Sequence, residues 1–178
     1  MNVGATSETD YGGYFMWGST RPNKPYECIW TYTPFNNGVG SYNEKYFNSI
    51  KDTVCPNGIL AKEYDAAAQT MGGDWRMPTK DEIQELLDNT TSVWVANYNG
   101  SGKNGRKFTA SNGNSIFIPA AGDYLDDSEF DVGDRGYIRS SSLNTENLRG
   151  AWGLHFRSDV CYVRNDGRYD GLCVRGVL

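Results

Sequence analysis

The feature that most constrains the fold is a change in the spacing of apolar residues near Thr90. Before it, segment 80–89 carries apolar residues at helical spacing, and a Thr79–Glu82 capping-box pattern marks its start. After it come short runs rich in β-branched and aromatic residues, separated by Gly and Asn turns, as is typical of strands. The sequence therefore predicts an α+β domain whose C-terminal half is rich in β structure.

The same patterns place the other elements. A second helix is expected at 60–71, ending at a Gly-Gly pair, and 10–18 indicates a turn that enters a strand. Residues 19–58 are rich in Pro, Asn and Gly, so we expect a long irregular excursion there. A tight turn is expected at Asn165-Asp166-Gly167. The expected strands are 92–98, 106–110, 114–119, 151–157, 160–164 and 172–177, the last three in one antiparallel sheet.

Alternation in the last part of the chain predicts which side chains face the core, because successive residues of a strand point to opposite faces. The side chains expected to be buried are Trp152, Leu154, Phe156, Cys161, Val163, Leu172 and Val174. Those expected to be exposed on one surface are His155, Arg157, Tyr162, Arg164, Asp166 and Asp170.

Length and charge limit the classes of protein. A chain of 178 residues without an evident linker fits one domain, 1–178. The net charge of −5 argues against a nucleic-acid partner, which favours a basic face. There is no apolar run of the roughly 20 residues that a membrane span needs, and no signal-peptide pattern. We expect a monomer without a cofactor.

The four cysteines, Cys28, Cys55, Cys161 and Cys173, do not form a metal-binding pattern. No two of them make a CxxC, and His155 is the single histidine, so the usual zinc spacings are absent and no metal is expected. Two bridges, Cys28–Cys55 and Cys161–Cys173, are compatible with the sequence, and so are free buried thiols. Spacing alone does not decide between them.

Four segments together resemble a known family: NVGATSETDYGGYFMWG (2–18), GGDWRMPTKDEIQELLDN (72–89), NGNSIFIPAAG (112–122) and GYIRSSSLNTENLRGAWGLHF (136–156). They are similar to the C-type-lectin-like domains of gut Bacteroidales and their phages, the fold subgroup shared with formylglycine-generating enzymes. The resemblance implies a C-type-lectin-like fold with two helices and a non-enzymatic binding function. Relatives usually carry a strand before the segment that matches 2–18, so we expect it to be missing or trimmed here.

Within that group, the C-terminal segment resembles the target of a diversity-generating retroelement, which rewrites adenines of a template copy of the gene. Such rewriting of Asn codons cannot produce Lys, Gln, Glu, Met or Trp. Residues 1–138 contain seven Lys, four Met and two Gln, whereas 139–178 contain none of these but six Arg. Only Glu146 and Trp152 of that segment are unreachable, and they would be fixed residues. We therefore expect 139–178 to be the variable region.

The resemblance also implies the contact residues, at positions where unmutated relatives are rich in Asn. They are Arg149, Gly150, Gly153, His155, Arg157, Tyr162, Arg164, Asn165, Asp166, Gly167 and Asp170. The expected partner is a protein or glycan on a cell surface, and the expected location is extracellular, on a cell surface or on a virion.

Other functions stay open. An undiversified lectin-like surface protein that binds glycans is the nearest alternative. An oxidase of the formylglycine-generating type would use Cys161 and Cys173, and a hydrolase would pair His155 with the serines at 140–142, although no nucleophile elbow occurs. The acidic stretch 123–134 could hold calcium, or it could be a solvated loop.

Overall fold

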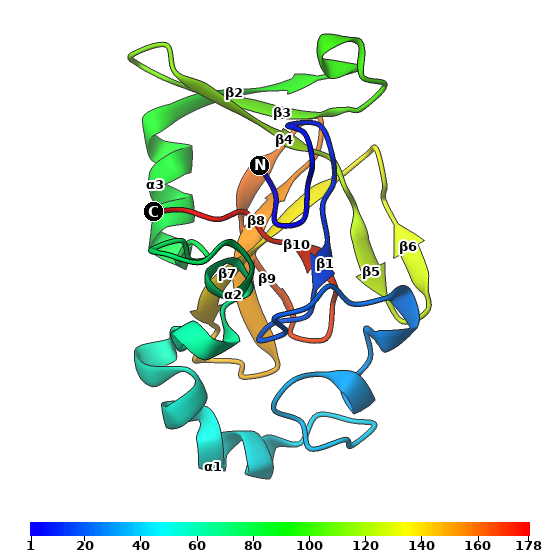
Figure 1. The fold of residues 1–178 in the computed structure, drawn as a ribbon, viewed down its shortest axis with the longest axis vertical. Coiled ribbons are helices and arrows are strands. Elements are labelled where there is room, and N and C mark those ends of the chain that lie inside the picture. The colour runs from blue at the N-terminus through cyan, green and yellow to red at the C-terminus, as the bar shows by residue number, and fades with distance from the viewer.

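The computed structural model describes all 178 residues and confirms the predicted mixture of helices and strands (Figure 1). None of its helices is long and apolar enough to cross a membrane. The α-helices are α1 (Glu44–Val54), α2 (Ala66–Met71) and α3 (Lys80–Asn89). Short 3-10 helices occupy Pro25–Glu27, Trp30–Tyr32, Pro56–Gly58, Lys62–Tyr64 and Tyr98–Gly100.

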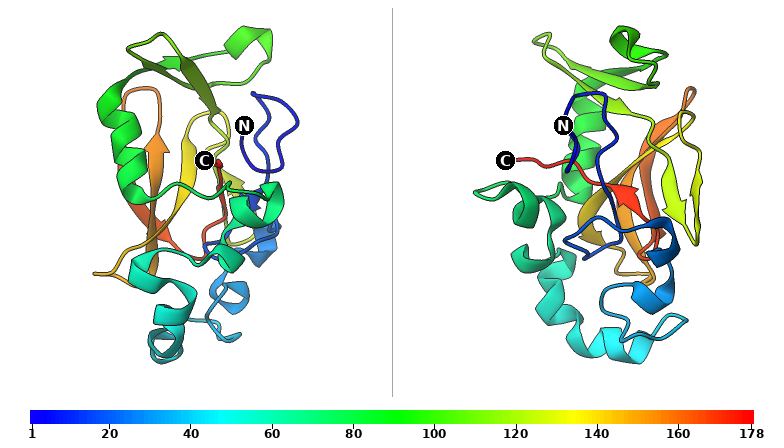
Figure 2. Two further views of the ribbon diagram at one scale, coloured as in Figure 1. Left: turned by 60° about the vertical axis from the view of Figure 1, so that its left-hand side comes forward. Right: turned by 45° about the vertical axis from the view of Figure 1, so that its right-hand side comes forward.

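The strands form three sheets. They are β1 (Tyr14–Phe15), β2 (Thr90–Val95), β3 (Gly105–Ala110), β4 (Ser115–Pro119), β5 (Asp123–Leu125), β6 (Ser128–Phe130), β7 (Gly136–Leu143), β8 (Gly150–Phe156), β9 (Cys161–Gly167) and β10 (Leu172–Cys173). The main sheet has the order β1-β10-β7-β8-β9, a second has the order β2-β3-β4, and β5 pairs with β6. Helix α3 lies against one side of the main sheet, and the β2–β4 sheet lies across one end of it (Figure 2).

The two predicted helices are present, although the first is shorter than expected. The capping box that starts α3 is formed: Glu82 N donates to Thr79 Oγ1 at 3.2 Å, and Thr79 N donates to the Glu82 carboxylate at 2.8 Å. In the predicted helix 60–71, only Ala66–Met71 is α-helical. Asp65 interrupts it, because its carboxylate caps α2 through Ala68 N at 2.9 Å.

The prediction that 19–58 is irregular throughout is wrong for 44–54, which forms α1. Asn43 caps this helix by accepting from Tyr46 N at 3.2 Å. Phe47 and Val54 are buried at helical spacing and join the same hydrophobic cluster as Trp17. Helix α1 therefore forms because tertiary packing of one apolar stripe outweighs the surrounding Asn and Gly.

The predicted hairpin at the C-terminal end is confirmed as β8 and β9, but its second strand is longer than predicted. Asn165 pairs with Trp152 and Gly167 with Gly150, so the tight turn predicted at 165–167 is wrong. The chain turns after Gly167 instead. The last predicted strand shortens to β10, where Cys173 pairs in parallel with Ile138 of β7.

The predicted core of this region is confirmed in part. Leu154, Phe156, Leu172 and Val174 are buried. Trp152, Cys161 and Val163 are only half-buried. Trp152 lies at the border with α3, where Lys80 Nζ is 4.0 Å from the centre of its ring. Amphipathic contacts of this kind leave part of the indole in water.

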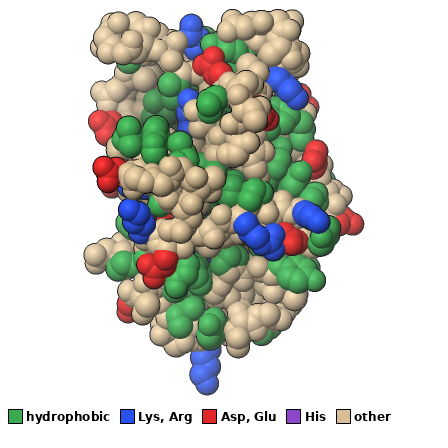
Figure 3. Space-filling model, viewed as in Figure 1, with side chains coloured by type: hydrophobic (Ala, Val, Ile, Leu, Met, Phe, Trp, Pro, Cys, Tyr) green, Lys and Arg blue, Asp and Glu red, His purple; other side chains and the backbone are tan.

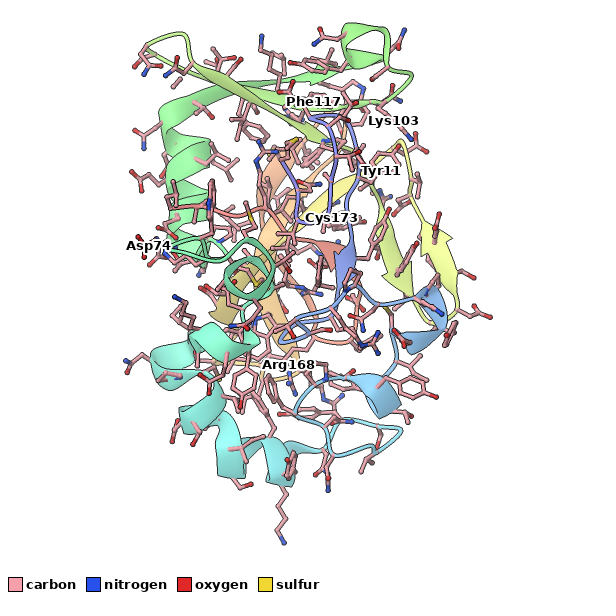
Figure 4. All side chains as sticks on the ribbon, in the orientation of Figure 1. Tyr11, Asp74, Lys103, Phe117, Arg168 and Cys173 are labelled. Carbon is pink, nitrogen blue, oxygen red and sulfur yellow. The ribbon has the colours of Figure 1, made fainter.

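A buried cation ties the end of the main sheet to α1. The Arg168 guanidinium carbon lies 3.9 Å from the centre of the Phe47 ring, and its Nε donates to Leu148 O at 2.9 Å. Figure 4 shows Arg168 at this junction. Burial lowers the pKa of Arg168 to about 10, so the side chain stays charged at neutral pH.

All four cysteines are free, so neither of the possible bridges is formed and the alternative of free thiols is confirmed. Cys28, Cys55 and Cys173 are buried, whereas Cys161 is half-buried. Burial raises the pKa of Cys28 and of Cys173 to about 12. Neither of these two thiols is therefore activated as a nucleophile.

Candidate functional site

The side of β7–β9 that faces away from α3 carries a group of polar and aromatic side chains. Residues paired across neighbouring strands share a face. One such row joins Tyr137, His155 and Tyr162, and the next joins Arg139, Gly153 and Arg164. We call the following residues the polar sheet face: Tyr137, Arg139, His155, Tyr162, Arg164 and Asp166.

The outer part of this face is exposed, as predicted. Tyr162 on the edge strand β9 is 41% exposed, and the Arg164 side chain is 46% exposed. Arg157 lies in the β8–β9 turn and is exposed, with its Nε 2.7 Å from Asp159 Oδ1. Arg149, at the other end of the hairpin, is also exposed. These four side chains are therefore accessible to a large partner.

The prediction that His155 is exposed is wrong, because the residue is only 4% exposed. Its ring stacks on Tyr137 with centroids 4.8 Å apart, and Tyr162 approaches edge-on at 4.9 Å. Strand β8 is an inner strand, so large residues on both neighbouring strands cover the imidazole. Burial, followed by the Arg164 charge, lowers the pKa of His155.

Asp166 and Asp170 are also less accessible than predicted. The Asp166 side chain is only 8% exposed, and its Oδ1 lies 3.1 Å from Arg164 Nε. Asp170 is partly exposed as a residue, but its Oδ1 is buried without a hydrogen-bond partner. Asn165 and Gly167 are half-buried in β9. These residues support the exposed side chains rather than form the outer surface.

Two of the expected contact positions are buried glycines, Gly150 and Gly153. A Cβ atom at Gly153 would lie 2.6 Å from the Ile138 carbonyl oxygen. That oxygen belongs to the backbone, so relieving the clash would require the strand to shift. A Cβ atom at Gly150 would meet the Asn165 side chain, which can rotate. Gly153 is therefore a close-approach position between β7 and β8, and the expectation that it lies on the contact surface does not agree with its burial.

Sequence reasoning missed Arg139, the fully buried member of the polar sheet face. Its Nη2 donates to Gly167 O at 2.9 Å and to Asp170 O at 2.7 Å, and its Nε and Nη1 have no protein partner. Asp123 of β5 has a buried Oδ1 that is likewise unpartnered. An isolated Arg within a run of buried strand residues was the only signal for this arrangement.

Two carboxyl groups with raised pKa values, those of Asp123 and Asp170, lie within the electrostatic influence of the Arg139 guanidinium. Burial raises the pKa of Asp123 to about 6, and the neighbouring Asp131 and Asp166 charges add to the shift. Burial also raises the pKa of Asp170 to about 7, against the lowering effect of Arg139. The cluster therefore takes up protons between pH 8 and 5, close to physiological pH.

Replacing Asp170 by Asn should change stability in a pH-dependent manner. Because the pKa of Asp170 is raised on folding, the folded state holds this proton more tightly, and stability falls as pH rises from about 4 to 7. Asp170→Asn removes that loss. We expect the variant to gain about 1–3 kcal/mol more at pH 8 than at pH 5 in urea unfolding. The lowered pKa of His155 makes stability rise with pH below about 6.5. His155 is present in both proteins, so it does not affect the difference between them. An equal effect at both pH values would contradict a raised pKa.

The acidic stretch 123–134 does not gather its carboxylates. Its first part forms the β5–β6 hairpin, in which Asp126, Asp127 and Glu129 are exposed, and Asp134 is exposed in the turn that follows. Asp131 instead pairs with Arg135 at 3.2 Å and accepts from Tyr137 Oη at 3.1 Å. No three His, Cys, Asp or Glu side chains are placed together as metal ligands.

The residues of the two enzymatic alternatives are kept apart. Cys161 and Cys173 lie on β9 and β10, which are separated in the sheet by β7 and β8. Neither His155 nitrogen has a hydrogen-bond partner, and Ser140 Oγ donates to Trp152 O at 2.6 Å. Neither a cysteine pair nor a Ser–His pair is therefore assembled.

Comparison with models of protein families, with curated proteins and with solved structures finds no match to this chain. Inference about function therefore rests on the fold, on the polar sheet face and on the composition of the segment that forms most of it.

Proposed function

We propose that the chain is a ligand-recognition or adhesion domain of the C-type-lectin-like type, with residues 139–178 diversified by a retroelement. Its contact surface is the exposed part of the β8–β9 hairpin: Arg149, Arg157, Tyr162 and Arg164. One observation carries the proposal, namely that an aromatic side chain and three arginines are exposed on a hairpin whose other strand residues, in β8 and β9, are buried or half-buried.

The types of these side chains favour recognition. Tyr and Arg dominate binding hot spots, because each offers a large contact area together with hydrogen bonds. Tyr162 packs edge-on against His155, and Arg164 is held by Asp166, so both keep their orientation before a partner arrives. Pre-organisation of this kind lowers the entropic cost of binding.

Composition supports diversification of the same surface. The segment 139–178 has six Arg and no Lys, Met or Gln, and its exposed arginines include the two at the ends of the hairpin. A face open to random replacement must contribute little to folding, and exposed positions satisfy that condition. We infer a protein or glycan partner on a cell surface, met outside the cell or on a virion.

Deep sequencing of this gene in its source population tests the proposal. We expect codon differences to concentrate between 139 and 178, to arise at adenines of a nearby template copy, and to include Tyr162 and Arg164. Leu154 and Phe156 should stay constant because they are buried, and Gly153 because its Cβ would meet backbone. Differences spread evenly along the gene, or enriched at the buried residues, would refute diversification.

A further inference from the structure

The opposite side of the main sheet from the polar sheet face contains a pocket that the proposed function does not use. The pocket has a volume of about 360 Å³, within the range of small-molecule sites. Ile83 and Leu86 of α3 form one wall, Ile116 of β4 forms another, and Ile138 and Leu154 of the main sheet are part of the lining. Hydrophobic side chains gather beside α3 in the surface view (Figure 3).

One wall of this apolar pocket holds a cation. Arg175 lines it, and its guanidinium makes a single hydrogen bond, from Nη1 to Phe117 O at 3.1 Å. No carboxylate lies within ion-pair distance of Arg175. Partial burial lowers the pKa of Arg175. A desolvated cation with donors to spare favours an anionic partner.

The two acidic side chains that line the pocket do not cancel the preference of Arg175 for an anionic partner. Glu82 is already engaged by Arg76, with Nη1 at 2.7 Å and Nη2 at 2.5 Å from its carboxylate oxygens. Glu85 is an exposed residue on α3, so water screens its charge. Arg175 is therefore the half-buried charge of the pocket that has no ion pair, although the more distant Glu8 partly offsets the lowering of its pKa.

We propose that this pocket binds a small amphipathic carboxylate, with its hydrocarbon chain between α3 and β4 and its carboxylate on Arg175. The apolar walls remove the chain from water, and the guanidinium offers the paired N–H groups that match a carboxylate. The site is independent of the proposed recognition surface, because Ile138 and Leu154 point to the other side of the sheet.

Isothermal titration of the whole chain with octanoate tests this inference, with octan-1-ol and octylammonium as matched probes. We expect octanoate to bind more tightly than either. Arg175→Leu should weaken octanoate binding about tenfold or more and leave octan-1-ol binding unchanged, because one charge-assisted contact is lost. Ala110→Phe, which narrows the pocket wall at the end of β3, should weaken both. Tyr162→Ala should leave octanoate binding as it is.

Several results would overturn the inference. Absence of octanoate binding would refute the site, and tighter binding of octylammonium would assign the charged contact to Glu85. Equal affinities for octanoate and octan-1-ol would mean that Arg175 does not contribute to binding of the ligand. Octanoate binding that survives Ala110→Phe would place the ligand elsewhere. Circular dichroism melts of both variants establish that each is folded, and loss of binding with Tyr162→Ala would point to the polar sheet face instead.

Discussion

Phe156→Ala is expected to lower the free energy of unfolding by about 3–5 kcal/mol, because it leaves a cavity in a closed core. The Phe156 ring is completely buried, with Phe108 and Trp94 each 6.5 Å away between ring centroids. A Cβ at Gly136 on the facing strand would overlap this ring. The Phe156 ring therefore occupies the space left by the missing side chain of Gly136. Neighbouring side chains have little freedom to fill the cavity that Phe156→Ala would leave.

Tyr162→Ala, on the other face of the same hairpin, should lower the free energy of unfolding by only about 0.5 kcal/mol, because its edge-on contact with the His155 ring is lost but no core cavity forms. Arg164→Ala should cost somewhat more, up to about 1 kcal/mol, because it leaves the shielded Asp166 carboxylate without its partner. Tyr162→Ala therefore tests ligand binding with less effect on stability than Arg164→Ala. Urea unfolding of the three variants gives the comparison. Equal losses for Phe156→Ala and Tyr162→Ala would contradict the assignment of core and contact faces.

Local sequence patterns were sufficient for α3 and for the β8–β9 hairpin. The Thr79–Glu82 capping box and the extended pairing around Leu154 depend on neighbours in the chain, and both are formed. The end of β9 was not predictable in the same way. Asn165-Asp166-Gly167 has the composition of a turn, but pairing with β8 and the contact of Asp166 with Arg164 hold it extended. Tertiary pairing outweighs turn preference there.

The burial of His155 and Arg139 could not be predicted from alternation. A period of two separates the faces of a strand, but it does not say which face other segments cover. All eight residues of β7 are buried, so both of its faces are covered. The partners of Arg139 come from the last residue of β9 and from the turn after it, and Asp123 comes from a separate hairpin. These contacts join segments far apart in sequence, and no local pattern specifies them.

Arg139→Met should destabilise the protein by about 3–5 kcal/mol at pH 8, because breaking a buried charged arrangement leaves its other members uncompensated. Gly167 O and Asp170 O would lose their donor, and the Asp123 and Asp170 carboxyls would lose the nearest positive charge. Methionine keeps most of the volume, so packing changes little. The loss should be smaller at pH 5, where the two carboxyls, with pKa values of about 6 and 7, are largely protonated in the folded state.

A double-mutant cycle with Asp170→Asn separates charge from backbone hydrogen bonding. If the Arg139 charge compensates Asp170, the double variant should be more stable at pH 8 than the sum of the single effects by about 0.5–3 kcal/mol. The coupling should fade at pH 5, because a protonated Asp170 resembles Asn in charge. Additive effects at both pH values would mean that Arg139 acts only through Gly167 O and Asp170 O. The polar sheet face would then be supported by the hydrogen bonds from Arg139 to these two backbone carbonyls, and the Asp170 charge would play no part in stabilising it.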